Sequence, residues 1–205
     1  MLSKRYSAII VSVFAILFVF AGDALADLNV SGTSVQNYSG ADVPAPDWSY
    51  WQSVADYTVN GNKTFKKNKT FSGIWYITGN VTIKQNVTIN GTIIARGNVI
   101  FNRQNITINA QGSNPAVISD GNVEVTSNRK NITLNGFVVS TGNFTMGEKA
   151  RMTVNGGISA EGNVETDEKN HLYVNHDPNR APNTGFLGGV GGGVGLSRST
   201  WREVY

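Results

Sequence analysis

The sequence contains no cysteine and only a small share of charged residues. Of its 205 residues, 15% are Asp, Glu, Lys or Arg, and none is Cys. The lack of cysteine excludes disulfide frameworks and thiolate metal sites. The formal net charge is +3, and the basic residues are scattered apart from Lys66, Lys67 and Lys69. Because nucleic-acid binding calls for a concentrated basic stripe, the sequence predicts no nucleic-acid partner.

Glycine, asparagine and short apolar stretches are abundant instead. The chain has 23 Gly, and 40% of its residues are hydrophobic. Gly and Asn are poor helix formers, which argues against a helical bundle. Val, Ile and Phe are interleaved regularly with polar residues, which argues against disorder. The length suits one domain with appendages.

The first 26 residues have the pattern of a secretory signal peptide. Lys4 and Arg5 precede the apolar run "SAIIVSVFAILFVFAG", and "ALA" ends at Ala26. This pattern predicts cleavage before Asp27 and a secreted, periplasmic or cell-surface protein. An uncleaved anchor is the alternative, because the apolar run is long for a signal peptide. In that case this segment would be the protein's only membrane contact.

Three short phrases recur in a fixed order along the middle of the chain. "GNV" or "GNF" starts at intervals of 18, 24, 21 and 20 residues, at Gly79, Gly97, Gly121, Gly142 and Gly162. Phrases such as "NITLNG" follow, and phrases such as "GFVVSTG" join the two. A unit of about 20 residues with three short apolar runs is typical of a solenoid.

Within each phrase apolar and polar residues alternate, as in a β-strand. In "NITLNG", Ile132 and Leu134 point to one side and Thr133 to the other. Gly and Asn suit the corners because they tolerate positive φ, and stacked Asn side chains are expected to form ladders along the axis. The sequence therefore predicts an all-β fold, a single-stranded parallel β-helix (β-solenoid) of about five or six coils, roughly 25–30 Å long.

The chain is expected to divide into a signal peptide (1–26), an N-terminal segment with a short capping helix (27–59), the solenoid (60–176) and a Gly-rich tail (177–205). The helix is expected in "VPAPDWSYWQSVAD", with Asp47 as its N-cap and one apolar face. We expect it to close the N-terminal end, because open strand edges pair with other chains.

The tail ends in "STWREVY", which supplies the candidate assembly or docking residues Trp201, Arg202, Glu203 and Tyr205. Two interpretations are equally supported by the sequence. Trp201 packs back on the solenoid wall, or the segment engages a partner.

Carbohydrate binding or degradation is a second functional hypothesis, because parallel β-helices also include polysaccharide lyases and hydrolases. The candidate sugar-stacking residues are Trp48, Trp51 and Trp75. The acids nearest the Gly-Asn corners form two pairs, Asp120 with Glu124 and Glu161 with Glu165. The pairs are two coils apart, about 9.6 Å along the axis, farther than a retaining carboxylate pair needs. The sequence therefore predicts no enzyme.

A metal site could be drawn from His171, His176 and Asp177 at the end of the repeat. Two His and one acid at this spacing are weak evidence for a metal site. The sequence predicts no metal and no cofactor.

The segments "PDWSYW", the "GNVTI…NGTII" coils and the closing "WREVY" resemble the β-solenoid region of PilX-like, type IV pilus-associated proteins, over residues 43–205. Those proteins usually begin with a pilin-type helix, where this chain has the predicted signal peptide. Coil by coil, the sequence is also similar to bactofilins and other polymer-forming solenoids.

The resemblance implies a non-catalytic structural protein of cell-surface or pilus-associated assembly, with protein partners or self-association. Two alternatives stay open. One is a carbohydrate-binding or polysaccharide-degrading β-helix, and the other is a self-polymerising bactofilin-like filament.

Overall fold

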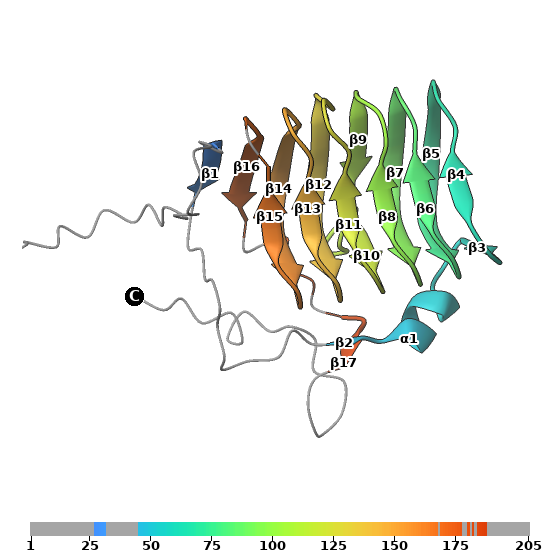
Figure 1. Ribbon diagram of the computed structural model, residues 1–205. Helices are drawn as coiled ribbons and strands as arrows, with labels where there is room; N and C mark the ends of the chain where they lie inside the picture. The colour runs from blue at the N-terminus through green and yellow to red at the C-terminus, as the bar shows by residue number, and fades with distance from the viewer. Residues whose placement is uncertain are drawn as a thin grey trace, which may run out of the picture.

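The computed structural model describes residues 27–31, 45–167, 169–177, 180, 182 and 184–187. These residues form a parallel β-solenoid of about six stacked turns, with very little helix (Figure 1). The predicted fold class is confirmed.

Nine strands form the larger parallel sheet, and six form a second parallel sheet. The larger sheet has the order β1-β16-β14-β12-β10-β7-β5-β3, and β9 lies between β7 and β12. Its strands are β1 (Asp27–Ser31), β3 (Tyr57–Val59), β5 (Lys69–Ile77), β7 (Val87–Ala95), β9 (Ile106–Asn109), β10 (Val117–Ser119), β12 (Ile132–Ser140), β14 (Arg151–Ala160) and β16 (His171–His176).

The second sheet has the order β15-β13-β11-β8-β6-β4. Its strands are β4 (Lys63–Phe65), β6 (Val81–Ile83), β8 (Val99–Phe101), β11 (Val123–Val125), β13 (Phe144–Met146) and β15 (Val164–Thr166). A separate antiparallel pair joins β2 (Ala45–Pro46) to β17 (Phe186–Leu187), and the single helix of the described residues is α1 (Trp48–Ser53). The solenoid therefore begins at Tyr57, three residues before the expected start.

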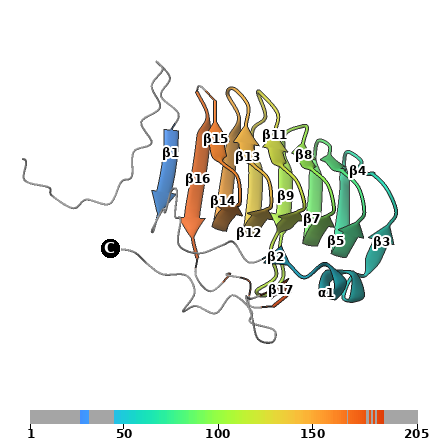
Figure 2. The ribbon, with the colours of Figure 1, turned by 60° about the horizontal axis from the view of Figure 1, so that its bottom comes forward.

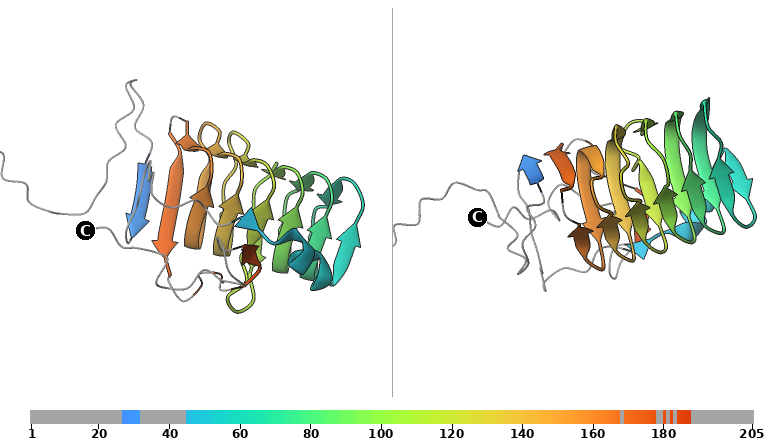
Figure 3. Two further views of the ribbon diagram at one scale, coloured as in Figure 1. Left: turned by 90° about the horizontal axis from the view of Figure 1, so that it is seen from below. Right: turned by 45° about the horizontal axis from the view of Figure 1, so that its top comes forward.

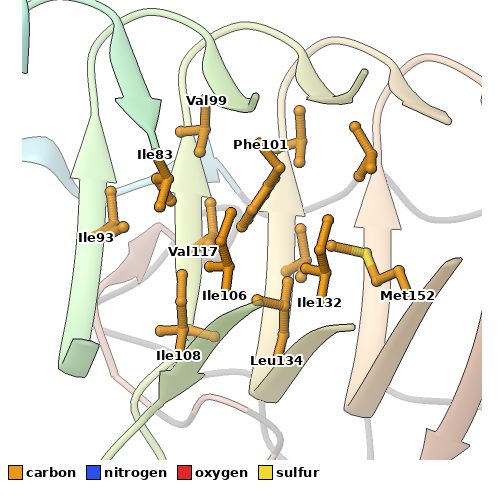
Figure 4. Packing of buried hydrophobic residues seen from close by; sticks show 14 of the residues in the cluster. Ile83, Ile93, Val99, Phe101, Ile106, Ile108, Val117, Ile132, Leu134 and Met152 are labelled. Atoms are coloured by element: carbon orange, nitrogen blue, oxygen red, sulfur yellow. The ribbon is translucent and has the colours of Figure 1, made fainter. Parts of the chain in front are cut away.

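Stacked apolar columns fill the interior of the rod (Figure 4). Val81, Val99 and Val123 are in register on neighbouring strands, and all three are fully buried. Burying one such side chain contributes about 1.5–3 kcal/mol relative to leaving it exposed. The alternation read from the sequence therefore sets which side of each strand faces inward.

The Gly-Asn phrase forms one corner of every turn. The backbone N–H of Asn98 donates to Oδ1 of Asn80, and that of Asn80 donates to Oδ1 of Asn62, both at 2.8 Å. The same bond recurs at the corners that follow, up to Asn163. A Cβ on Gly97 would meet Asn80 Oδ1, and the glycines from Gly79 to Gly162 in the same phrase face the asparagine of the previous turn in the same way. These corners therefore need glycine because the previous turn occupies that space.

Two further asparagine ladders run along the axis through side-chain amides, at donor–acceptor distances of 2.7 to 3.0 Å. One joins residues with φ between +55° and +58°, namely Asn68, Asn86, Asn105 and Asn131. The other joins Asn90, Asn109, Asn135, Asn155 and Asn175. The predicted asparagine ladders are confirmed.

The helix α1 begins as the sequence indicates. The carboxylate of Asp47 accepts hydrogen bonds from the Tyr50 backbone N–H at 3.0 Å and from the Ser49 hydroxyl at 2.6 Å. The helix lies along the flank of the rod near its N-terminal end, rather than across the open end (Figure 3). The predicted helical cap is therefore present, but it covers a side face.

A row of outward-facing apolar residues explains this position. Tyr76, Ile94, Ile118 and Val139 are in register on β5, β7, β10 and β12, and together with Trp51 they form a buried cluster. The row would otherwise face water. Packing α1 on it removes this apolar surface from solvent, which stabilises the helix through burial.

The C-terminal segment 184–187 holds the helix in place. β17 pairs with β2, and the indole N–H of Trp51 donates to the Gly185 carbonyl at 2.8 Å. The ring of Trp51 also meets that of Phe186 edge-on, with centroids 6.3 Å apart. We call residues 45–53 and 184–187 the clasp, since they join two distant parts of the chain over one face of the rod.

Candidate functional site

The N-terminal end of the rod is closed by aromatic rings. Tyr57 stacks on Trp75, with centroids 4.2 Å apart and an interplanar angle of 20°. Phe65 is fully buried and meets the rings of Phe71 and Trp75 edge-on, at 4.9 and 5.3 Å. Tyr57 is 49% exposed. These rings fill the first turn, so the closure expected from the helix comes from the strands themselves.

Two lysines of the first turn occupy positions that are apolar in the next turn. Lys63 is in register with Val81, and Lys69 is in register with Val87. Both valines belong to the buried core. The ammonium of Lys63 lies 4.8 Å from the centroid of the Trp75 ring. Another coil stacked on this end would have to bury both charges, so the lysines oppose end-to-end pairing.

The C-terminal end is covered by a strand from the opposite end of the chain. β1 pairs in parallel with β16 over five residues, from Asp27 opposite His171 to Ser31 opposite Asn175 (Figure 1). Sequence reasoning missed this strand. A signal was available, because "DLNVS" from Asp27 has Leu and Val at the same two positions as "HLYVN" from His171.

The second sheet ends in β4 on one side and β15 on the other, and within the described part of the chain each has one neighbour. Exposed acids surround the last turn, at Glu161, Glu165 and Asp167. The first turn carries Lys63 and Lys69. The two ends therefore differ in charge as well as in the way they are covered.

The three tryptophans proposed for sugar stacking do not form one platform. Trp51 is 1% exposed and belongs to the clasp, so its ring is packed inside this chain. Trp48 has the Arg96 guanidinium 4.5 Å from its ring centroid. Trp75 lies in the first turn under Tyr57. Each ring is already packed against a neighbour of this chain.

Asp120 is engaged in a structural contact. Its carboxylate is 2.8 Å from the Arg96 guanidinium, and the Thr141 hydroxyl lies 3.5 Å from its other oxygen. A side-chain hydrogen bond to Tyr76, followed by the hydrogen bond and charge of Asp120, raises the pKa of Arg96 above its ordinary value. Because Arg96 also covers Trp48, it ties the clasp to the solenoid wall.

The remaining acids do not converge on Asp120. Glu124 is exposed on the outer face of β11, and Glu165 accepts a hydrogen bond from the Asn163 amide at 3.0 Å. His171 stacks near Tyr173, and His176 meets Phe137 edge-on. In the described ranges, no group of three or more His, Asp or Glu side chains is placed to hold a metal ion.

The predicted docking residues Trp201, Arg202, Glu203 and Tyr205 lie outside the described residues, as does the predicted signal peptide. Among the residues that the structure does describe, no helix is long and apolar enough to cross a membrane.

We compared the chain with known proteins at three levels. No protein-family model, no curated protein and no solved structure matches it.

Proposed function

We propose that the protein is a non-catalytic structural rod of a cell-surface or pilus-associated assembly. The observation that carries this proposal is the hydrogen bonding of the corners. The ladder of Gly-Asn corners joins every turn from Asn62 to Asn163. Such bonding resists local opening along the whole length, which is the property a spacer needs.

The use of polar groups also favours a structural role. Asp120 pairs with Arg96, and the Asn side chains bond to one another rather than converging on one point. Most glycoside hydrolases use two carboxyl groups that flank the scissile bond. Glu124 and Glu165 lie on separate strands, β11 and β15, and Asp120 is held by Arg96. We therefore propose that none of these acids is catalytic.

The two covered ends favour a single rod over a self-assembling filament. Stacking on the N-terminal turn would bury Lys63 and Lys69, and burying an unpaired charge costs several kcal/mol. Stacking on β16 would require β1 to leave. Attraction between exposed charges of the two ends adds only about 0–1 kcal/mol for each pair.

We further propose that Trp201, Arg202 and Glu203 dock the rod to a protein partner, as the resemblance to pilus-associated proteins implies. The test is the amount of protein retained in the envelope fraction of the host cell. Trp201→Ala with Arg202→Ala should release the protein into the medium. Ser197→Ala with Thr200→Ala, in the same segment, should leave it retained.

Two other measurements test the rod itself. Light scattering and negative-stain microscopy of the purified protein should show monomers, and filaments would favour the bactofilin-like alternative. Incubation with polysaccharides should release no reducing ends, and a release would show that the protein is an enzyme.

Equal retention of both tail variants in the envelope fraction would overturn the docking role of residues 201–203.

A further inference from the structure

Basic residues that are scattered in the sequence come together on one edge of the rod. They lie in the turns that lead from the second sheet back into the larger sheet, or at the first residue of the strand that follows (Figure 2). We call this set the basic ridge, and its members are Lys66, Lys67, Lys69, Lys84, Arg103, Arg129, Lys130, Lys149, Arg151 and Lys169.

The folding of the solenoid produces this edge. Residues about 20 positions apart in the sequence become neighbours on successive turns, about 4.8 Å apart along the axis. The insertions in the turns before β9 and β12 change the sequence spacing but not the edge on which the turns lie. The ridge was therefore missed from the sequence because its members follow no fixed interval.

The charges of the ridge are mostly exposed and lack acidic partners. Eight of its ten side chains are exposed, and Lys84 and Arg129 are half-buried. Within the described ranges only one ridge residue has an ion pair, Lys149 with Glu148 at 3.0 Å. Arg129 donates to the neutral Thr126 hydroxyl instead. The sequence of these turns has three acids, Glu148, Asp167 and Glu168, against the ten basic residues of the ridge, so positive charge is in excess there.

Neutral hydrogen-bonding groups accompany the charges. The ladder from Asn68 to Asn131 lies in the same turns. A row of threonines in register runs beside it on the larger sheet, formed by Thr70, Thr88, Thr107, Thr133 and Thr153. The edge thus presents cations, amides and hydroxyls in parallel lines along the rod.

We propose that the basic ridge binds a linear acidic polysaccharide along the rod axis. The cations would pair with its carboxylate groups, and the threonine hydroxyls and ladder amides would meet its hydroxyl groups. Like charges on neighbouring turns repel one another, and a polyanion along the ridge relieves that repulsion and releases its own counterions. This inference names a partner for the proposed rod.

The residue types of the ridge favour a glycan over two other anionic partners. Single-stranded nucleic acid is bound by aromatic side chains that stack on bases, and the described turns of the ridge contain no aromatic residue. A membrane surface is bound by a broad basic face with apolar residues that insert. The ridge is a narrow line with polar neighbours, which suits one extended chain.

The test measures binding of the purified protein to polygalacturonate, with dextran as a neutral glycan and single-stranded DNA as a second polyanion. Arg103→Gln with Lys130→Gln removes two ridge charges. Gln52→Glu with Gln111→Glu lowers the net charge by the same two units at exposed positions off the ridge. Thermal unfolding of both variants serves as the check on folding.

We expect polygalacturonate to bind, dextran not to bind, and DNA to bind more weakly than polygalacturonate. The ridge pair should weaken polygalacturonate binding roughly tenfold in low salt and lower the salt dependence by about two counterions. The off-ridge pair should stay within about twofold of the unchanged protein, because distant exposed charges are screened. Lys66→Gln with Lys84→Gln provides a second ridge pair if the first lowers the unfolding temperature.

Three results would overturn the proposal. Equal weakening by both charge-matched pairs would mean that only net charge matters. Tighter binding of DNA than of polygalacturonate would assign the ridge to nucleic acid. Lack of polygalacturonate binding would remove the partner, and if the protein is still retained through residues 201–203, the structural role would stand without it.

Discussion

The two ends of the rod cover their open strand edges in different ways. At the N-terminal end the first turn covers itself with stacked rings and places Lys63 and Lys69 where later turns have apolar residues. At the C-terminal end the last turn is covered by β1, which comes from the other end of the chain. The N-terminal end is covered by side chains of its own turn. The C-terminal end is covered by a separate strand, β1, which a deletion can remove.

This difference predicts which change would join rods together. A variant without residues 27–31 that also carries Lys63→Val and Lys69→Val is expected to assemble end to end. The deletion uncovers the edge of β16, and the substitutions restore the apolar residues that the next turn has in register. We expect a change from monomers to filaments, measured by light scattering and negative-stain microscopy.

The control is the same deletion with Lys66→Val and Lys67→Val. It removes the same charge from residues that are exposed in the turn, so this protein should remain monomeric. Filaments in the control, or monomers in the first variant, would show that Lys63 and Lys69 do not prevent end-to-end assembly.

The next largest effect is expected from the ring that fills the first turn. Phe65→Ala should lower the free energy of unfolding by about 3–5 kcal/mol, because Phe65 is fully buried between Phe71 and Trp75. Phe65→Leu keeps most of the volume and should cost less than about 1.5 kcal/mol. Denaturant unfolding measures both, and equal small losses would mean that the N-terminal turn is frayed rather than packed.

The asparagine ladder gives a smaller contrast between the middle and the end. Asn109 bonds to both Asn90 and Asn135, whereas among the described side chains the ladder reaches Asn175 only through Asn155. Asn109→Ala should cost about 1–3 kcal/mol, and Asn175→Ala about 1 kcal/mol or less. Denaturant midpoints compare the two, and a larger loss at Asn175 would contradict a ladder whose strength grows toward its centre.

The smallest effect concerns the response of the clasp to a fall in pH. The Ser49 hydroxyl and then the Tyr50 N–H lower the pKa of Asp47 below its ordinary value of 3.8. A lowered pKa means that this carboxylate stabilises the fold above pH 3.8 and that the contribution is lost as pH falls through the folded-state pKa. Asp47→Ala should weaken α1 by about 1 kcal/mol at neutral pH.

The fluorescence of Trp51 reports this change, because its indole is buried in the clasp. In the unchanged protein, an acid titration through the folded-state pKa of Asp47 should weaken the clasp and so change the indole fluorescence. Asp47→Asn keeps a capping oxygen without a titrating group, so its clasp should not respond in that range. An identical acid transition in Asp47→Asn would assign the transition to another group.

Sequence reasoning succeeded wherever the information was local and repeated. The alternation around Ile132 and Leu134 gave the inward faces, the Gly-Asn phrase gave the corners, and Asp47 gave the start of α1. These features depend on residues within one turn and its neighbours, so a single sequence contains them. The stacked asparagines followed from the same repeat.

The features that were missed depend on contacts between distant segments. The outward apolar row from Tyr76 to Val139 exists only when four turns are stacked in register. A single sequence therefore did not indicate that α1 packs on the flank of the rod. β1 is five residues long and separated by the whole solenoid from its partner β16. The basic ridge forms only when turns of unequal length are superimposed.

The pairing of β1 with β16 also sets an order of events during folding. The turns between them can form one after another from local contacts as the chain becomes available. Strand β1, however, has no strand to pair with until residues 171–175 are in position. We therefore expect the most N-terminal strand of the rod to dock only after the turn that holds β16 has formed, because β16 is its neighbour in the sheet.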